Sequence, residues 1–560
     1  METAVRSHQT PRRGARTALW ALALFLAALL VRILCSAAMP LHTDEIFHIL
    51  AATSWAEDGS FRFGDGSYSR AWVYTILAGA SFEAFGQTNV FLARLPAVIA
   101  GALMVPVLFV WMIRSADRTA AWLSALLLCF AELAIRSSDF ARFYSLQALL
   151  VLVAAAMAYR FLLEPSRRKV WLPLLALACL ALAAQLQVTT MIAAGAMGLF
   201  LVLYLATRQR TRAMLADAKT RNLILVLVAI AAAGAAVVGY LALPMLLEAE
   251  PWAEKNKSNY LYYHIFLSRD YRLFWYLIPV ASILALSRYP RLAAYCLVMW
   301  LVPLVVHSFG GMKADRYISY AFPFFIALWG LAFAAAVPWL RPAIVQIVEK
   351  LACFTGLRVG ERWQGMITAL VLVLCAISAT AVNKMLVESP KLIAKGAIRF
   401  ARDPASTFAN PPDPNWSDRL GVLRRDMNEG AVLVSVDELR TQFYLGTPNF
   451  GMYLPPASVT TARNGFTIDV RNGRPVLEDV DDLARVVSCT SRGVLVIPAR
   501  RWLQFGFMDE PMAEFIKARL RPGPPRIPEF HVFRWQHPAK VQGCQAVQSE
   551  ARTGTAHAER

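Results

Sequence analysis

The sequence predicts a mainly α-helical, polytopic membrane protein with a C-terminal α/β domain. Apolar runs of about 20 residues, the length of a membrane-spanning helix, recur through much of the 560-residue chain, of which 57% is hydrophobic. Lysine and arginine gather in the short segments between these runs. After residue 387 the composition turns Pro-rich and polar, and strand-like and helix-like stretches then alternate.

Charge predicts the topology of the helical part. Arg6, Arg12, Arg13 and Arg16 precede the first apolar run, and basic flanks stay in the cytoplasm. About eleven spans then keep the basic loops on one side of the membrane. We expect these spans at residues 18–39, 90–113, 119–137, 140–162, 170–188, 189–207, 222–246, 272–287, 291–309, 317–337 and 364–386. The run 71–85 is too short to cross, so we expect a helix near the outer surface or a re-entrant segment there.

An odd number of spans puts the C-terminal part outside the cytoplasm. The expected parts are a cytoplasmic tail (1–17), a transmembrane catalytic domain (18–386), a periplasmic α/β domain (387–545) and a disordered tail (546–560). A cleaved signal peptide is the alternative for the first run, but the many later spans favour an uncleaved anchor.

Within the C-terminal domain, short apolar stretches predict the secondary structure. We expect strands at 431–436, 442–445, 494–497 and 531–535. We expect helices at 480–487 and 510–520. The domain holds two cysteines, Cys489 and Cys544, which face an oxidising compartment if the topology holds. The sequence does not give their distance, so their pairing stays open.

The formal net charge of +19 raises the question of a nucleic-acid partner. The basic residues lie in loops between apolar runs, where the positive-inside rule accounts for them. We therefore expect membrane lipids and no nucleic acid as partners. The Ala- and Arg-rich composition is typical of a high-GC bacterium, so the expected location is the bacterial inner (plasma) membrane, with the C-terminal domain periplasmic.

A pair of carboxylates, Asp44 and Glu45, directly follows the first span. Ionisable groups beside a membrane helix are costly to place and are therefore candidates for function. A carboxylate at this position can act as a general base or hold a hard divalent cation. His48 lies three residues after Glu45 and on a helix could share a cation with it. The alternative for His48 is an interfacial histidine without a catalytic part.

Further charged residues gather at the outer ends of later spans. Asp139 and Arg142 belong to one expected outer loop, and Lys313, Arg316 and Tyr317 to another. Arginine and lysine bind phosphate, arginine through two parallel hydrogen bonds, and a tyrosine adds a hydroxyl donor. Asp139 could bind a divalent ion or pair with a neighbouring arginine. Carboxylates and phosphate-binding cations on one membrane face suit group transfer from a phosphorylated lipid.

Other polar features are better explained by structure alone. Glu132 and Arg136, four residues apart, are expected to form a structural ion pair. Arg94 and the following Leu-Pro are expected to position a helix. The aromatic stretch 260–264 is expected to form an interfacial belt, with sugar stacking as its alternative.

Several short motifs together resemble those of the GT-C superfamily of polytopic glycosyltransferases, and within it the protein O-mannosyltransferases and lipid A aminoarabinose transferases. The motifs are Asp44-Glu45, the stretches 91–96 (FLARLP) and 138–146 (SDFARFYSL), Lys313 with Arg316-Tyr317 ahead of Pro323, and the segment 443–446 (FYLG). The resemblance covers nearly the whole membrane part. The acidic pair is its most specific motif, and the others gain weight from occurring together.

This resemblance implies a polyprenyl-phosphate sugar as donor and a hydroxyl of a glycan, lipid or protein as acceptor. Asp44 would be the general base, with Glu45 beside it, and the acceptor would displace the lipid phosphate with inversion. The residues expected to bind the donor phosphate are Arg142, Lys313, Arg316 and Tyr317, because its developing charge needs preorganised cations. Mg²⁺ or Mn²⁺ stays open as a cofactor.

Two other functions share some of these features. A lipid-linked-glycan polymerase or ligase would use a pyrophosphate-linked donor, and the sequence does not resolve that difference. A non-enzymatic carrier or flippase for such lipids would carry polar residues in both leaflets, whereas here they crowd toward one side of the membrane.

Overall fold

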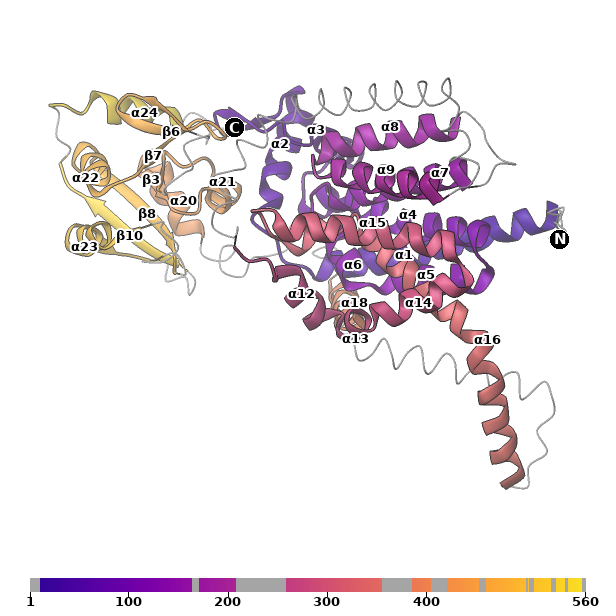
Figure 1. The fold of residues 1–560 in the computed structure, drawn as a ribbon. Helices are drawn as coiled ribbons and strands as arrows, with labels where there is room; N and C mark the ends of the chain where they lie inside the picture. Colours follow the sequence, from indigo (N-terminus) through magenta and orange to yellow (C-terminus); the bar gives the residue numbers. More distant parts are fainter. Residues whose placement is uncertain are drawn as a thin grey trace, which may run out of the picture. The chain divides into compact units, whose positions relative to one another are not determined.

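The computed structural model describes residues 11–163, 171–207, 258–354, 385–403, 420–452, 460–499, 502, 508–524, 530–538 and 542–555. The chain forms two compact units (Figure 1). The helical unit comprises Met1–Met39, Arg94–Pro244 and Ala253–Pro404, and the mixed unit comprises Pro40–Ala93, Met245–Trp252 and Ala405–Arg560. The predicted span 222–246 and nearly all of 364–386 lie outside the described residues.

The described part of the helical unit is made of helices. They are α1 (Pro11–Ala38), α4 (Val90–Ser115, which begins in the mixed unit), α5 (Arg118–Phe130), α6 (Glu132–Ser138), α7 (Tyr144–Leu163), α8 (Trp171–Leu186), α9 (Thr190–Thr207), α12 (Tyr262–Asp270), α13 (Arg272–Tyr276), α14 (Ile278–Arg288), α15 (Pro290–Phe309), the 3₁₀ helix η3 (Asp315–Ile318), α16 (Phe322–Phe354) and α18 (Met385–Arg402).

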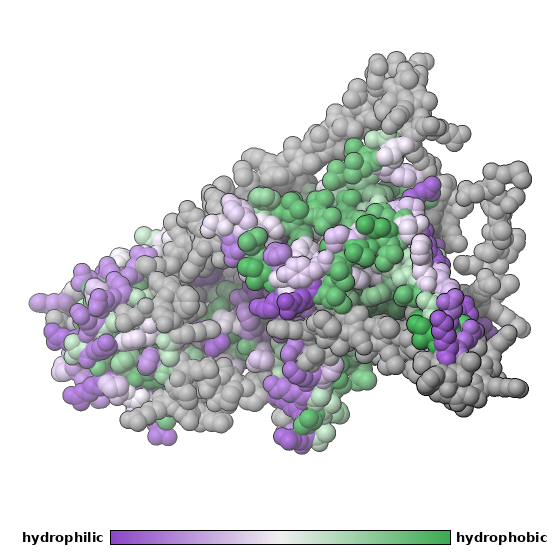
Figure 2. Space-filling model, turned by 60° about the horizontal axis from the view of Figure 1, so that its bottom comes forward, coloured by the Kyte–Doolittle hydropathy of each residue, from purple (hydrophilic) through white to green (hydrophobic). Residues whose placement is uncertain are grey.

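Six helices of the described part are long and apolar enough to cross a membrane: α1 from Gly14, α4, α7, α9, α15 and α16 as far as Ile347. Helices α5 and α6 add a seventh span if the pair is one, bent by 56°, so the predicted span 119–137 is broken. Helices α8 and α14 are apolar but shorter than predicted. Figure 2 shows apolar side chains gathered over the helical unit. The chain is a multi-pass membrane protein, and its number of spans stays a prediction.

Contacts between loops agree with the predicted alternation of sides. Asp117 caps α5 by accepting a hydrogen bond from the Ala120 amide at 2.9 Å. The same carboxylate forms an ion pair with Arg288, at the end of α14, also at 2.9 Å. Both loops are predicted to face the cytoplasm, and the ion pair places them at the same end of the bundle.

Segments predicted to face outward meet in the same way. The Leu133 amide of α6 donates to the Tyr271 hydroxyl at 2.9 Å. The Tyr263 hydroxyl of α12 donates to the Ala314 carbonyl at 3.1 Å. Three expected outer clusters of the sequence therefore lie together at one end of the helical unit.

Arg94 fixes the outer end of α1. Its Nη1 donates to the carbonyls of Ser36 and Met39, each at 3.0 Å, and the side chain is buried. The last carbonyls of a helix lack partners within the helix, and a cation there also complements the helix dipole. The predicted positioning role of Arg94 is confirmed, and it acts shortly before the acidic pair.

The mixed unit contains an eight-stranded sheet in the order β5-β6-β7-β4-β3-β8-β10-β9. The central pairs β7-β4, β4-β3 and β3-β8 are parallel, and the outer pairs are antiparallel. The strands are β3 (Val432–Ser435), β4 (Phe450–Met452), β5 (Thr460–Arg463), β6 (Phe466–Asp469), β7 (Arg474–Leu477), β8 (Arg492–Pro498), β9 (Arg521–Pro522) and β10 (Phe530–Gln536). The helices that go with them are α20 (Leu420–Asn428), α21 (Glu438–Leu445), α22 (Val480–Cys489), α23 (Glu510–Arg519) and α24 (Gln545–Thr555).

Successive residues of the central strands point to opposite faces of the sheet, and each face is covered by helices (Figure 1). Val434 and Leu495 belong to a core with α22, α23 and α24. Leu433 and Val496 belong to a second core with α20 and α21. The predicted α/β architecture is therefore present as three layers. The strands predicted at 431–436, 494–497 and 531–535 and both predicted helices are confirmed.

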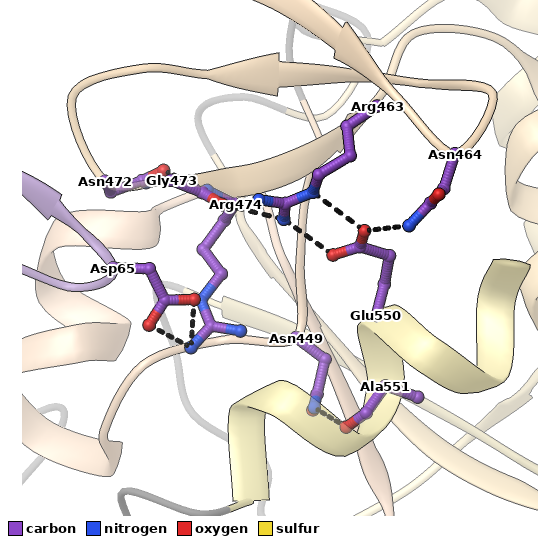
Figure 3. Close-up of polar contacts among 9 residues, drawn as sticks. All are labelled: Asp65, Asn449, Arg463, Asn464, Asn472, Gly473, Arg474, Glu550 and Ala551. Atoms are coloured by element: carbon purple, nitrogen blue, oxygen red, sulfur yellow. Dashed lines mark hydrogen bonds and ion pairs between the residues drawn. The ribbon is translucent and has the colours of Figure 1, made fainter.

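Two predictions for this unit were wrong. The stretch 442–445 is helical, as part of α21, because Asp437 caps the helix and because Leu439 and Phe443, four residues apart, pack on the same side. The expected disordered tail forms α24 as far as Thr555. Its Glu550 accepts hydrogen bonds from Arg463, and these contacts order the segment (Figure 3).

The chain between α1 and α4 belongs to the mixed unit. It forms α2 (Glu45–Asp58), a hairpin of β1 (Arg62–Phe63) and β2 (Gly66–Ser67), and α3 (Trp72–Phe85). Asp65 in the hairpin turn donates its amide to the Asn472 carbonyl at 2.8 Å. Its carboxylate lies 3.1 Å from the buried Arg474 guanidinium (Figure 3). A Cβ on Gly66 would collide with the Arg471 carbonyl, so the hairpin packs tightly on the β6–β7 turn.

Replacing both Cys489 and Cys544 with serine should destabilise the mixed unit. The two cysteines form a disulfide between the end of α22 and the start of α24, with their Cα atoms 5.4 Å apart. Loss of a native disulfide typically costs about 2–4 kcal/mol. Denaturant unfolding of the full chain, followed by hydrogen exchange of the β8 amides, measures the change. A reducing agent should lower the stability of the wild type and leave the double variant unchanged; equal stability of the oxidised wild type and the variant would contradict the prediction.

Arg94→Met should weaken the end of α1, because the Ser36 and Met39 carbonyls lose a charged donor. Buried groups left without their hydrogen bonds cost about 1–3 kcal/mol. A thermal-unfolding assay in detergent measures the loss, and Arg118→Met, at an exposed arginine of α5, is the matched control. Similar unfolding temperatures for both variants would show that Arg94 does not hold the helix end.

Candidate active site

Asp44 stands at the N-terminus of α2. It is the N-cap residue, and the side chain makes no capping hydrogen bond to the helix. The carboxylate is 33% exposed, and its Oδ2 lies 4.0 Å from Nδ1 of His42. The Asp44 amide also donates to that His42 nitrogen at 3.1 Å. The Asp44 carboxylate therefore takes no part in capping the helix, and part of it reaches solvent.

Glu45 differs from its neighbour in burial. The side chain is fully buried, and Oε2 accepts a hydrogen bond from the His42 amide at 2.8 Å. This bond closes the turn 42–45, which carries Asp44. The geometry therefore gives Glu45 a positioning role in the turn, next to the more accessible Asp44.

His48 is also fully buried. Its Nδ1 is 2.9 Å from the Thr75 hydroxyl of α3, and its ring makes edge contacts with Tyr68 and Tyr74, each at 5.1 Å between centroids. These contacts fit the structural alternative for His48. The contacts of His48 with Thr75 and Tyr74 join α2 to α3.

Apolar packing holds α2 in place on its other sides. Phe47 stacks on Tyr68 at 5.0 Å between centroids, and Ile46 packs in a cluster with Leu439 of α21. Gly79 of α3 lies so close to Trp55 that a Cβ would collide with the indole ring. The C-terminal domain thus contacts the helix that begins with the acidic pair, within one unit.

The cations predicted to bind phosphate lie in the helical unit, where Arg316 is central. Its guanidinium lies over the rings of Phe140, Tyr144 and Tyr317, with centroid distances of 5.8, 6.0 and 5.6 Å. Tyr144 and Tyr317 are themselves 6.2 Å apart between centroids. Such aromatic faces attract a guanidinium and fix its plane. The structure thus brings together two outer motifs that are far apart in the sequence.

Lys313 lies in the loop between α15 and η3 and is 9% exposed. Its Nζ donates to the Ser308 carbonyl at 2.9 Å and to the Gly310 carbonyl. An ammonium has three protons, so these contacts brace the loop and leave donor capacity on the same nitrogen. Burial lowers the pKa of Lys313 below its ordinary value.

Arg142 and Asp139 flank this cluster on the α6–α7 loop. Both are buried. The Arg142 guanidinium lies 5.3 Å from the Phe143 ring centroid, and Phe143 contacts Tyr144 at 4.7 Å between centroids. Asp139 lies close enough to Arg32 of α1 for the two charges to attract. The pairing of Asp139 with an arginine of its own helix end stays a prediction.

A pocket of about 330 Å³ opens beside the cluster. It is lined by charged side chains of α6, α12, η3 and α18, among them Glu132, Arg136, Arg269, Asp270 and Asp315. The predicted Glu132–Arg136 pair is confirmed at 2.6 Å. A second pair joins Arg269 and Asp270, also at 2.6 Å, and its hydrogen bonds raise the pKa of Arg269.

The described part of the chain contains no group of three or more His, Cys, Asp or Glu side chains arranged to hold a metal ion. A shared cation between Glu45 and His48 has no support in their contacts, since Glu45 braces its own turn and His48 faces Thr75.

The sequence did not reveal the contacts that dock the β1–β2 hairpin, which follows α2, on the C-terminal sheet. Asp65 and Arg474 are 409 positions apart, and no pattern connects them. The one usable sign was the Asp65-Gly66 dipeptide, which is typical of a tight hairpin turn. It identifies the hairpin but not the surface on which the hairpin docks.

No protein-family model and no curated protein matches the sequence. Solved structures do match. ArnT from Cupriavidus metallidurans, a lipid A aminoarabinose transferase bound to undecaprenyl phosphate, aligns with a TM-score of 0.58 and 15% identity over 93% of this chain and 99% of its own. Its apo form aligns with a TM-score of 0.55, also at 15% identity, over 92% of this chain and 98% of its own.

An oligosaccharyltransferase from Archaeoglobus fulgidus, tethered to an acceptor peptide, aligns with a TM-score of 0.50 and 12% identity over 86% of this chain and 69% of its own. ArnT and this enzyme are both GT-C glycosyltransferases. The resemblance inferred from the short motifs is thereby confirmed in three dimensions: the chain has the GT-C fold.

Proposed function

We propose that this protein is a membrane glycosyltransferase that moves a sugar from a polyprenyl-phosphate donor to a hydroxyl acceptor. The observation that carries the proposal is the aromatic-framed Arg316 cluster at one end of the helical unit. A structure with this fold was solved with undecaprenyl phosphate, and another with an acceptor peptide. Both complexes agree with a lipid-phosphate donor and a separate acceptor.

The proposed reaction is a single displacement. Asp44 takes the proton of the acceptor hydroxyl, and the hydroxyl oxygen attacks the anomeric carbon. The bond between that carbon and the phosphate oxygen breaks, the electron pair stays on the phosphate, and the configuration inverts. The lipid phosphate leaves as an anion, so the chemistry needs fixed positive charge more than a general acid.

Arg316, Arg142 and Lys313 supply that positive charge in the proposal. Aromatic contacts orient both guanidinium groups before substrate binds, so little reorganisation is required as charge develops on the phosphate. Tyr317 adds a hydroxyl donor. Glu45 acts by holding the turn that presents Asp44.

We propose that transfer takes place at the periplasmic face of the inner membrane. The pocket lined by Glu132, Arg269 and Asp270 is proposed to hold the transferred sugar, because paired carboxylates and guanidinium groups offer both acceptors and donors to sugar hydroxyls. A pyrophosphate-linked donor remains the alternative within the same enzyme class, with the carrier or flippase as the non-enzymatic one.

Asp44→Asn should reduce transfer by about 10²–10⁴-fold, the usual contribution of a general base, without changing membrane insertion. Transfer of labelled sugar from a synthetic polyprenyl-phosphate donor measures this, with glycan profiling of a deletion strain to identify the natural acceptor. Glu57→Gln, at an exposed carboxylate of α2, is the matched control. Normal turnover in Asp44→Asn would end the assignment of the base.

Donor binding should weaken as the pH rises, because burial lowers the pKa of Lys313. The charged ammonium binds phosphate, so its contribution is present below this pKa and is lost as the pH rises through it. The KM for the donor should therefore rise on the alkaline side. Lys313→Arg should move this rise to higher pH, since an arginine stays protonated.

In the same assay, Arg316→Gln should raise the donor KM at every pH, because an arginine is protonated throughout the range. The control Arg272→Gln, at an exposed arginine, should leave the KM unchanged. Superimposable pH profiles for the wild type and Lys313→Arg would exclude Lys313 from donor binding.

A further inference from the structure

Helix α18 has one buried and one exposed face. The buried face packs against α1 and α5. On the buried face the Ser389 hydroxyl donates to the Phe130 carbonyl at 2.9 Å. Gly396 lies so close to α1 that a Cβ would collide with the Leu34 carbonyl. The Arg399 guanidinium donates to the Ala37 carbonyl at 2.9 Å. These contacts fix α18 along the last turns of α1.

The exposed side chains of α1 indicate where α18 lies relative to the lipid bilayer. Leu19, Leu22, Leu26 and Leu30 form a stripe at helical spacing and are each more than half exposed. In a membrane-spanning helix such a stripe faces hydrocarbon. The stripe ends before Leu34, where α18 packs on α1, so α18 lies where the hydrocarbon region gives way to headgroups.

The exposed face of α18 is basic and partly apolar. Lys391, Lys395 and Arg402 are exposed on one side of the helix, and Ile398, which is 52% exposed, lies among them. Two acids adjoin this face: Glu388, which pairs with Lys391 at 3.2 Å, and Asp403, which directly follows Arg402. A helix with this composition lies in the interface, with apolar side chains in the lipid and basic groups at the phosphates.

We propose that α18 binds the headgroups of anionic phospholipids through Lys391, Lys395 and Arg402. From Lys391 to Arg402 the helix rises about 16 Å. One phosphate cannot contact cations spread over that length, so the surface fits a row of anionic headgroups and not the single phosphate of a polyprenyl donor. The proposal does not depend on the transferase activity.

Native mass spectrometry of the full chain in detergent, titrated with phosphatidylglycerol or phosphatidylcholine, tests the proposal. The triple variant Lys391→Gln, Lys395→Gln, Arg402→Gln should lose phosphatidylglycerol affinity by about fivefold for each removed charge, with phosphatidylcholine unchanged. Higher salt should weaken binding to the wild type more than to the variant. The variant with Lys391→Arg and Lys395→Arg, which keeps the charge, should bind as the wild type does.

The matched control removes three basic residues from an exposed part of the mixed unit, by Lys517→Gln, Arg519→Gln and Arg521→Gln. Equal loss of phosphatidylglycerol in this control would show that overall charge, not α18, attracts the lipid, and would overturn the proposal. Unchanged phosphatidylglycerol affinity in the α18 variant would overturn it as well. If the triple variant unfolds, Lys395→Gln alone provides the same comparison.

Discussion

Hydrocarbon excludes unpaired charge, and this constraint determines where the helical unit can hold its functional residues. Arg32 shows how strict the constraint is. It is fully buried, and its guanidinium donates to the Ser138 hydroxyl and to the Ala28 carbonyl, each at 3.2 Å, while the charge of Asp139 stabilises it. Gly101 makes the space, since a Cβ there would collide with Ser138. The cations of the candidate site, in contrast, lie at helix ends or in loops. There water, headgroups and aromatic rings can stabilise Arg142, Lys313 and Arg316.

The acidic pair Asp44-Glu45 is held by contacts within the mixed unit and not by the membrane helices. Asp44 is presented by a turn that Glu45 closes, on a helix that packs against the C-terminal domain. The hairpin that follows is tied to that domain by the Asp65–Arg474 ion pair. The mixed unit thus holds the residue proposed as the base, whereas the helical unit holds the cations proposed to bind phosphate. In the proposal, a change in the support of either group of residues can lower activity without touching a reacting group.

The features that could be predicted from the sequence are those that depend on local composition. Apolar runs and loop charges predicted the helices. The polar motifs at outward ends predicted two segments that do meet, since Arg316 lies over the rings of Phe140 and Tyr144. The failures depend on tertiary contacts. The 442–445 stretch is β-like in composition, but packing of Leu439 and Phe443 on α2 favours a helix. The tail is polar, yet Val547 is fully buried and Glu550 pairs with Arg463. The partners of these two segments, α2 and Arg463, are far away in the sequence. Local composition therefore could not reveal the contacts.

The bend between α5 and α6 connects these observations. At Ala131 the backbone turns extended, so neighbouring backbone groups lose their helical partners, and buried backbone groups left without a partner are costly. Two distant side chains replace them: Ser389 of α18 donates to the Phe130 carbonyl, and the Tyr271 hydroxyl accepts from the Leu133 amide. The bend redirects α6, and the loop that follows it carries Phe140 and Tyr144 to Arg316. Helix α18 therefore supports the bend, and through it the loop at Arg316, by the same face that fixes it to α1. Its opposite face is the one proposed to bind lipid headgroups.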